Sequence, residues 1–486
     1  MTIKTPLIVM LAILATMTIG FISIFNLPDA PKAQQKPVSL NHVTVINPTL
    51  NRLQVANLSV EDGAIRFRES SSQPSQYDGS FVLPGLVNMH SHTPGKNLLN
   101  LSPMFSLAAI MHGVTTWRDA LDPDGSGVAA LHQQIRHQHW PTPQVFSCAV
   151  VTRGDARWPN SNFLEEPHHA EGLIYSLKQQ GHSCIKSYEN LSQELISSIK
   201  HAAHRHGMQV IGHVPEGLTF EQAALPDTQH FFGINTITQF NVLSRNGDWR
   251  AVHPSRIEEI SEFIIKNKLI NTPTLVTLQQ IQQYRYFDEA RNNLTYQFLP
   301  DFYLDVVWHP TTGLPAYRNL KAHTLTLAEQ ALRKKQLLLK KLHDGGATLN
   351  IGTDTQQPFV VPGIAMWQEM RLFQQSGIDP EQVLAYASWK ARQQLPIDKT
   401  LALKQQGLVE NNGIADFLIF SRDPTLSLDN LDSLQAVVVR GKLYDINELK
   451  KTMSALQQHY RSWPLNSISK FFAKRSMQKI ASKFTH

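Results

Sequence analysis

Short apolar runs alternate with longer amphipathic runs through the middle of the chain. One short run ends at His90, and the others read "GVTTWRD", "PQVFSCAVV", "CIKSY", "MQVIGHV", "DTQHFFG", "LINTPTLV" and "ATLNIGTD". Strands that alternate with helices are typical of βαβ units around a parallel sheet. There are eight such runs, which is the number of strands that closes a (β/α)8 barrel. We therefore expect an α/β fold built on such a barrel.

Both flanks of this central block have a different sequence pattern, in which short β-like runs are separated by turn residues. They read "HVTVIN" and "LSVEDGAIRFRES" before the block, and "ADFLIFSRDP" and "LQAVVVRGKLYD" after it. Such runs predict one small β-sandwich domain completed by both ends of the chain. A chain of 486 residues has room for the barrel and this second domain. The expected limits are 38–82 and 401–447 for the sandwich, 83–400 for the barrel and 448–486 for a basic helical tail.

Longer amphipathic segments predict further helices. The segment from Thr324 to His343 has a helical pattern that Gly345 and Gly346 are suited to end. The stretches 235–271 and 279–321 are longer than ordinary loops. We expect these two stretches to hold extra helices that cover the site.

The C-terminal tail also has a helical pattern. Between Ala473 and Phe484 the basic side chains of Arg475, Lys479 and Lys483 lie opposite an apolar face. The pattern fits a helix that lies on an anionic bilayer, a helix packed on the barrel, or a loose basic tail. The sequence does not choose among the three.

The N-terminus carries the longest apolar run of the chain. Residues 5–28 include no charged side chain, and "PLIVMLAILATMTIGFISIF" is about as long as a membrane-spanning helix. Its length and the prolines of "LPDAPKA" favour an uncleaved anchor over a cleaved signal. Lys4 precedes the run and Lys32 and Lys36 follow it, so the positive-inside rule does not indicate export. The signal-like layout alone leads us to expect a membrane-anchored chain whose barrel lies on the extracytoplasmic, periplasmic side.

Charge and cysteine content narrow the range of partners. The 45 basic and 39 acidic residues give a net charge of +6, a mild excess that is concentrated near the C-terminus. This distribution is compatible with an anionic membrane surface and argues against nucleic acid as a partner. Cys148 and Cys184 each lie in an apolar, strand-like run, so we expect buried free thiols and no disulfide. A homo-oligomer stays open.

Candidate metal ligands stand at the ends of the predicted strands. Side chains alternate faces along a strand, so His90 and His92 of "LPGLVNMHSH" project to the same side. The ends of other runs supply Lys186, His213, His230 and Asp354. Each alone also fits a structural role, as a core histidine, a snorkelling lysine or a helix-capping aspartate. Six in order, at the strand ends where parallel barrels place reactive groups, favour a metal site. Imidazole and carboxylate ligands suit zinc first, and also iron or manganese.

Lys186 is the unusual member of this set, because divalent cations repel an ammonium group. A metal-rich pocket would lower the pKa of the lysine until the amine is neutral. Reaction with carbon dioxide would then give an anionic carbamate able to bridge two ions. With two divalent ions, this carbamate, Asp354 and a bridging hydroxide, the site keeps a net charge of about +1, which can polarise a carbonyl group.

The same segments resemble a known family. Over nearly all of 38–445 the chain is similar to the amidohydrolase superfamily, in its imidazolonepropionase-like and Xaa-Pro dipeptidase-like branch. The matching pieces are "LPGLVNMHSH", "HGVTTWRD", "IKSYENLS", "AAHRHGMQVIGHVPEG", "DTQHFFG", "IGTD", "IDPEQVLAYASWKARQQL" and "GLVENNGIADFLIFSRDP". The resemblance implies the (β/α)8 barrel and a binuclear centre with carboxylated Lys186 between two ions. It assigns one ion to His90, His92 and Asp354, and the other to His213 and His230.

The chain departs from the family pattern at three places. "VVTRGDARWPN" stands where relatives often have Gly-Gly-His after the third strand. Gln229 precedes His230 where a glutamate is usual, and "ENNGI" replaces the common Pro-Gly-Lys. The first departure falls in the substrate pocket, so the resemblance does not fix the substrate. The set of metal ligands is intact.

The resemblance implies hydrolysis of an amide C–N bond in a small substrate, such as an N-acyl amino acid or an Xaa-Pro-like dipeptide. A metal-bridging hydroxide attacks the carbonyl, and Asp354 passes the proton to the leaving nitrogen. Tyr188 shares the strand face of Lys186 and is a candidate for binding the oxyanion or a substrate carboxylate, although simple packing fits it equally well. Arg153 is a candidate clamp for a substrate carboxylate, with a surface ion pair as the alternative.

Three other functions fit the same residues. A mononuclear deaminase of a heterocycle would use the spacing of His213 and Glu216, but Pro215 between them and Lys186 at the bridging position oppose it. A membrane-anchored protein of this fold could also bind metal or a partner without catalysis. Lactones and phosphotriesters are further substrates for such a site, because fold and metal set do not fix the substrate.

Overall fold

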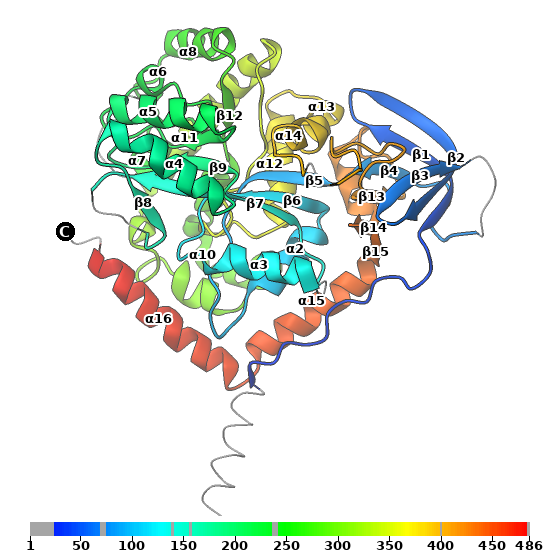
Figure 1. Ribbon diagram of the computed structural model, residues 1–486. Helices are drawn as coiled ribbons and strands as arrows, with labels where there is room; N and C mark the ends of the chain where they lie inside the picture. The colour runs from blue at the N-terminus through cyan, green and yellow to red at the C-terminus, as the bar shows by residue number, and fades with distance from the viewer. Residues whose placement is uncertain are drawn as a thin grey trace, which may run out of the picture.

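A nearly closed barrel of parallel strands forms the centre of the molecule (Figure 1). The computed structural model describes residues 24–68, 74–137, 140–154, 158–235, 242–398 and 401–483. Neighbouring barrel strands pair in the order β5 (Leu86–Ser91), β6 (Val114–Asp119), β7 (Gln144–Thr152), β9 (Cys184–Ser187), β10 (Gln209–Gly212), β11 (Asp227–Gln229) and β12 (Ile270–Thr272). The short strand β8 (Ser161–Phe163) pairs with β7 outside this path. The expected α/β class with a parallel barrel is confirmed.

The eighth predicted run closes the gap between β12 and β5 without forming a regular strand. Leu349 makes a parallel bridge to Asn271 beside β12. On the other side, Met89 N donates to Ile351 O at 2.9 Å. The segment therefore joins the first and last strands through backbone hydrogen bonds on both sides.

A disulfide inside the barrel corrects the expectation of free thiols. Cys148 on β7 and Cys184 on β9 are register partners, with Cα atoms 4.4 Å apart, and their sulfur atoms are bonded. Both side chains are buried in a small cluster with Ala120 and Ile211. The sequence places each cysteine in an apolar strand, but it does not show that the two strands are neighbours in matching register. That register brings the two sulfur atoms together.

Helices surround the barrel, as the alternating pattern predicts. They are α2 (Ser102–Ile110), α3 (Ser126–His137), α4 (Ala170–Gln179), α5 (Gln193–Arg205), α6 (Phe220–Ala223), α7 (Val242–Gly247), α8 (Pro254–Lys266), α9 (Val276–Gln280), α10 (Phe287–Asn292), α11 (Ala322–Asp344), α12 (Ile364–Gln375), α13 (Pro380–Tyr386) and α14 (Trp389–Arg392). Helix α11 ends at Asp344 with Gly345 as its C-cap, as expected. The two long stretches contain helices, including α7, α8 and α10, and a π-helix at Tyr303–Val307.

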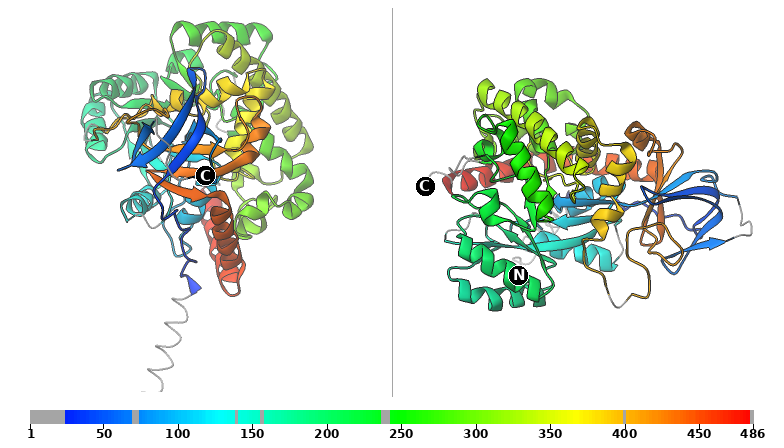
Figure 2. Two further views of the ribbon diagram at one scale, coloured as in Figure 1. Left: turned by 90° about the vertical axis from the view of Figure 1, so that its right-hand side faces the viewer. Right: turned by 90° about the horizontal axis from the view of Figure 1, so that it is seen from above.

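Both flanks of the barrel join in one sheet at its side (Figure 2). The order is β15 (Lys442–Asp445), β14 (Leu434–Val439), β13 (Phe417–Phe420), β4 (Phe81–Pro84), β1 (Ser39–Asn47), β2 (Asn51–Glu61) and β3 (Ala64–Arg68). The two ends of the chain therefore meet, as predicted. They form a single continuous sheet and not the two facing sheets of a sandwich, because β13 pairs directly with β4.

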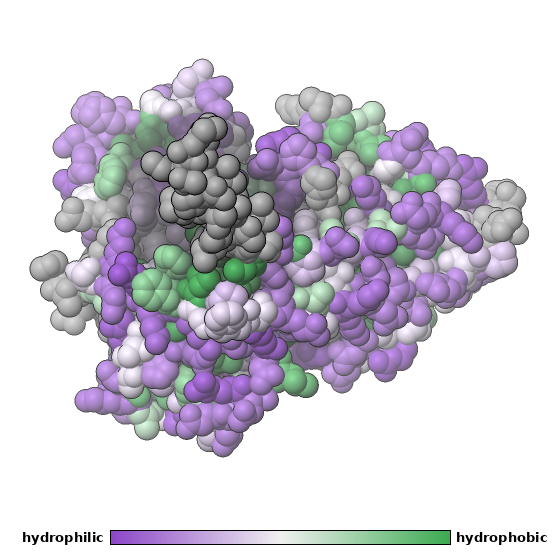
Figure 3. Space-filling model, turned by 90° about the horizontal axis from the view of Figure 1, so that it is seen from below, coloured by the Kyte–Doolittle hydropathy of each residue, from purple (hydrophilic) through white to green (hydrophobic). Residues whose placement is uncertain are grey.

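The last two helices run along one face of the molecule, which Figure 3 shows from below. They are α15 (Ile446–Arg461) and α16 (Leu465–Lys483). Met477 of α16 is buried, and Ala473 and Ile480 pack against the barrel core, so of the three alternatives for the tail the packed helix is found. Among the described residues, no helix is long and apolar enough to cross a membrane. Most of the expected anchor precedes Ile24, outside the described residues, and stays a prediction.

Candidate metal centre

The structure brings the six predicted ligands together at the carboxyl ends of the barrel strands. All six side chains are buried, with at most 9% of any residue exposed. The ring centres of His90 and His230 are 4.8 Å apart, and those of His230 and His213 are 5.0 Å apart. Lys186 Nζ lies 5.6 Å from the ring centre of Tyr188, whose ring in turn lies 4.9 Å from that of His213. The ligands come from β5, β9, the ends of β10 and β11, and the closing segment.

Asp354 faces two imidazoles. Its Oδ1 is 2.8 Å from Nε2 of His92 and 3.4 Å from Nε2 of His90. The backbone N–H of Asp354 donates to His90 O at 2.9 Å, which ties the closing segment to the end of β5. Asp354 has a φ of +56°, an uncommon conformation for a residue other than glycine and one found often at functional sites.

His230 also has a positive φ, of +62°, and several contacts hold it there. Its backbone N–H donates to Thr272 O at 3.0 Å, and its carbonyl accepts a hydrogen bond from Lys335 Nζ at 2.8 Å. Its Nδ1 lies 2.6 Å from the Thr274 hydroxyl. The ring is therefore fixed from both backbone and side chain, with Nε2 left for another partner.

Hydrogen bonds to acceptors determine which ring nitrogens carry protons. His92 Nδ1 lies 2.9 Å from Leu121 O, and His90 Nδ1 lies 2.6 Å from Oε1 of Gln229. Carbonyl oxygens only accept, so each Nδ1 donates, and in the neutral ring each Nε2 presents a lone pair. Those lone pairs face Oδ1 of Asp354, itself an acceptor. A cation between these atoms satisfies all of them, and two ligands of a tetrahedral zinc ion would be about 3.4 Å apart.

Unpaired nitrogens complete this fit. Within the described part of the chain, Nε2 of His90 and Nε2 of His213 are buried and have no hydrogen-bond partner. Buried polar atoms seldom lack a partner, and an imidazole nitrogen with a free lone pair is suited to bind a metal ion. His90, His230 and Asp354 offer ligand atoms that all lie within 4.8 Å of one another. The residues therefore suit a divalent metal, with the nitrogen and oxygen donors that zinc prefers.

Burial sets the protonation states that metal binding requires. It lowers the pKa of His90 to about 4, and it lowers those of His213 and His230 well below the usual range, helped by the charge of Lys186. Burial alone would raise the pKa of Asp354, but positive charge on the imidazole side of the carboxylate outweighs burial and holds that pKa well below its usual range. At neutral pH His90, His213 and His230 are therefore neutral, and the carboxylate of Asp354 is ionised. Burial also lowers the pKa of Lys186 to about 8, despite the attraction of Asp354.

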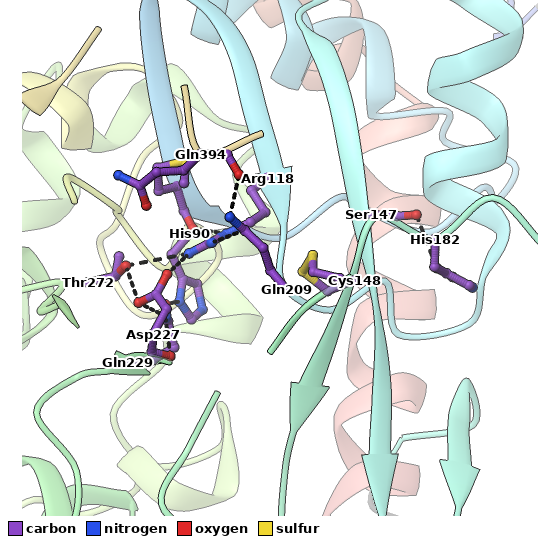
Figure 4. Close-up of a disulfide and its surroundings, with 12 residues drawn as sticks. His90, Arg118, Ser147, Cys148, His182, Gln209, Asp227, Gln229, Thr272 and Gln394 are labelled. Atoms are coloured by element: carbon purple, nitrogen blue, oxygen red, sulfur yellow. Dashed lines mark hydrogen bonds and ion pairs between the residues drawn. A yellow bond between two sulfur atoms is a disulfide. The ribbon is translucent and has the colours of Figure 1, made fainter. Parts of the chain in front are cut away.

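A buried network of hydrogen bonds orients His90, and the sequence alone did not predict most of it (Figure 4). Gln229 Nε2 donates to Asp227 Oδ1 at 2.7 Å, and Arg118 donates to Asp227 Oδ2 at 2.6 Å. The Thr272 hydroxyl donates to the same carboxylate. Arg118 and Asp227 are charged residues within predicted barrel strands, and charged residues are seldom buried unless paired. Charged residues at these positions are the signal in the sequence that could have revealed this network.

The two predicted substrate residues differ in their surroundings. Tyr188 is buried beside His213, and its hydroxyl accepts a hydrogen bond from Trp158 Nε1 at 3.1 Å. Arg153 is half exposed, and its Nε lies 3.4 Å from Glu165, which matches the surface ion pair considered as the alternative. Its role as a carboxylate clamp stays a prediction.

The family follows from the sequence match. A model of the Amidohydrolase family matches residues 81–444, which contain the whole barrel and all six candidate ligands. The chain belongs to the amidohydrolase family. It is therefore a hydrolase that acts on carbon–nitrogen bonds, as the resemblance implied. No curated protein sequence matches the chain.

Solved structures share this amidohydrolase's fold. A bottromycin amidohydrolase superposes with a TM-score of 0.67 at 20% identity, over 87% of this chain and 91% of that one. A Xaa-Pro dipeptidase with methionine in its active site gives 0.57 at 15% identity, over 84% and 100%. The A. niger ochratoxinase gives 0.58 at 14% identity, over 85% and 96%. At these identities the likeness concerns the fold.

Proposed function

We propose that this amidohydrolase is a metal-dependent enzyme that hydrolyses the amide bond of a small N-acyl amino acid or Xaa-Pro-like dipeptide. One observation carries the proposal: Nε2 of His90 and Nε2 of His92 both face Oδ1 of Asp354, while each Nδ1 is committed to an oxygen acceptor. Acceptor atoms that face one another in a buried site are stabilised by a cation between them.

The ligand set divides into two groups. His90, His92 and Asp354 would hold one ion and His213 and His230 the other, with Lys186 between them as a carbamate formed with carbon dioxide. Zinc fits these donors best, and iron or manganese also suits them. When bound, two divalent ions supply Lewis acidity that lowers the pKa of an attacking water and polarises the scissile carbonyl.

Asp354 is the residue that moves the proton. Its low pKa keeps it ionised at neutral pH, so it can accept a proton from the attacking water. It then gives that proton to the leaving nitrogen, and the products are a carboxylate and an amine. Tyr188 lies against His213 and is fixed by a hydrogen bond from Trp158, so its ring lies beside the second group of ligands.

The substrate class rests on two supports. The candidate ligands lie at the carboxyl ends of the barrel strands, where parallel barrels bind small molecules. Solved structures of similar fold include a Xaa-Pro dipeptidase and a bottromycin amidohydrolase. Lactones and phosphotriesters are the competing substrates on the same ligands.

A substrate screen with matched variants tests the proposal. The full chain, supplied with zinc, iron or manganese and bicarbonate, is assayed on N-acyl amino acids, Xaa-Pro dipeptides, lactones, phosphotriesters and aminoheterocycles. We expect hydrolysis of an amide that chelators abolish, and activity retained in Glu216→Gln. Ammonia release from a heterocycle that depends on Glu216 would favour the deaminase, and failure of all three metals to support any turnover would contradict the proposal.

A further inference from the structure

Three exposed aromatic side chains lie just before α16 and along it. Trp463, between the two helices, is 84% exposed, and Phe471 and Phe472 of α16 are 53% and 51% exposed. We call these three residues the aromatic corner. Figure 3 shows this face from below, with apolar residues gathered in the middle of a mainly hydrophilic surface. Grouped apolar side chains on a surface mark an interaction site more often than scattered ones do.

Basic side chains accompany the aromatic corner. Lys474, Arg475 and Lys479 of α16 are exposed, and the Arg475 guanidinium lies 4.9 Å from the ring centre of Phe471. The sequence contains no Asp or Glu after Glu448. Exposed aromatic rings beside uncompensated basic residues on one helix are typical of helices that lie in the headgroup region of an anionic bilayer.

The opposite face of α16 packs against the barrel, so the orientation of the helix is fixed. Met477 is buried, and Lys470 Nζ lies 2.7 Å from Asp305 in the π-helix of the β12–α11 connection. Asn466 Nδ2 donates to Asp301 at 2.9 Å in the same connection. The barrel therefore holds α16 so that Phe471 and Phe472 stay exposed, and the exposed rings are not a consequence of a loose tail.

The N-terminal segment reaches the body at the same corner. Figures 1 and 2 show the first described residues beside the junction of α15 and α16. Ile24, Phe25 and Leu27 pack against the barrel core, and Gln34 N donates to Leu443 O at 2.8 Å further along. The sequence before Ile24 is the uncharged apolar run that is about as long as a bilayer is thick.

We propose that the aromatic corner and the exposed basic residues of α16 form a docking face for an anionic phospholipid bilayer. The rings insert at the level of the headgroups, and Lys474, Arg475 and Lys479 contact the phosphates. A soluble protein partner fits this surface less well, because the apolar N-terminal run starts beside it. An N-terminal anchor alone would not orient the barrel, whereas this docking face fixes which side of the barrel turns toward the membrane.

The test places a fluorescent probe on the face in the full-length chain. Phe472→Cys and the control Leu337→Cys, an exposed position on α11, are each labelled with a polarity-sensitive dye and mixed with vesicles of phosphatidylcholine and phosphatidylglycerol. The native cysteines are bonded to each other and buried, so they do not react. The vesicles carry a quencher on their acyl chains.

We expect the emission at position 472 to be at least halved by the quencher, and that at 337 to stay unchanged. Replacement of Lys474, Arg475 and Lys479 by Glu, or of phosphatidylglycerol by phosphatidylcholine, should remove most of the quenching at 472. Equal quenching at the two positions, or quenching at neither, would overturn the proposal. An anchored chain whose face stays in water, or whose face binds a protein, gives no quenching at either position.

Discussion

Gln229 determines the tautomer of His90. Its Oε1 accepts a hydrogen bond from His90 Nδ1 at 2.6 Å, while its Nε2 donates to Asp227 at 2.7 Å. Asp227 already accepts from Arg118, so the amide of Gln229 can only point its oxygen toward the histidine. The Nε2 lone pair of His90 is therefore directed to Asp354. The neutral glutamine orients the histidine without adding a charge next to Asp227.

Removal of this hydrogen bond should weaken metal binding. Gln229→Met keeps the length of the side chain but cannot accept from His90, and partners of metal-bound histidines typically contribute about 10–100-fold in affinity. We expect metal affinity to fall by that order, measured by competition with a chelator. Gln374→Met on the exposed face of α12 serves as the control. Equal affinities for the two variants would mean that Gln229 does not orient the ligand.

Asp354→Asn should remove most of the activity. The amide cannot accept a proton from water, and general acid–base catalysis contributes about 10²–10⁴-fold to rate. We expect kcat to fall by that order at saturating metal, measured on whichever amide the screen identifies. Asp344→Asn, at the exposed end of α11, should leave kcat unchanged. Full turnover by Asp354→Asn with metal bound would refute the assigned proton transfer.

The disulfide should stabilise the chain. It closes a loop with a sequence separation of 36, and the chain-entropy model gives about 4 kcal/mol for a loop of this size. We expect the variant with Cys148→Ala and Cys184→Ala to unfold at lower denaturant concentration than the oxidised wild type. Reductant should lower the wild-type midpoint toward that of the variant. Midpoints that do not change in either case would show that the bond is absent in solution.

The sequence predicts the barrel and its metal ligands better than the disulfide and the hydrogen bonds that hold the strands and ligands in place. The ligands stand at the ends of apolar runs, where local pattern and strand order are enough to place His90, Lys186 or Asp354. Contacts between distant strands leave no local signal, so the Cys148–Cys184 bond was missed. The same limit applies to the hydrogen-bonded network from Arg118 through Asp227 to Gln229, which joins β6 and β11 across the barrel.

Glu369 makes stability depend on pH. It is fully buried on α12 and accepts from the N–H groups of Leu275 and Val276, next to Thr274, the partner of His230. Burial raises the pKa of Glu369 from 4.5 to about 8, so the folded chain holds a proton that the unfolded chain has released. This contribution to stability is complete below about pH 4.5 and is lost as pH rises to about 8.

Denaturant unfolding of the wild type and Glu369→Gln between these pH values measures the effect. We expect the free energy of unfolding of the wild type to fall with rising pH relative to the variant. Glu329→Gln, on the exposed surface of α11, should follow the wild type. Parallel profiles for wild type and Glu369→Gln would contradict the assigned pKa.

The number of metal ions bound per chain decides whether the centre is binuclear. The full chain is purified with bicarbonate present, and its metal content is determined by elemental analysis beside those of Lys186→Ala and the exposed control Lys266→Ala. We expect about two transition-metal ions per chain in the wild type and in Lys266→Ala, with a clear loss in Lys186→Ala. A single ion per chain that is indifferent to Lys186 would contradict the binuclear centre.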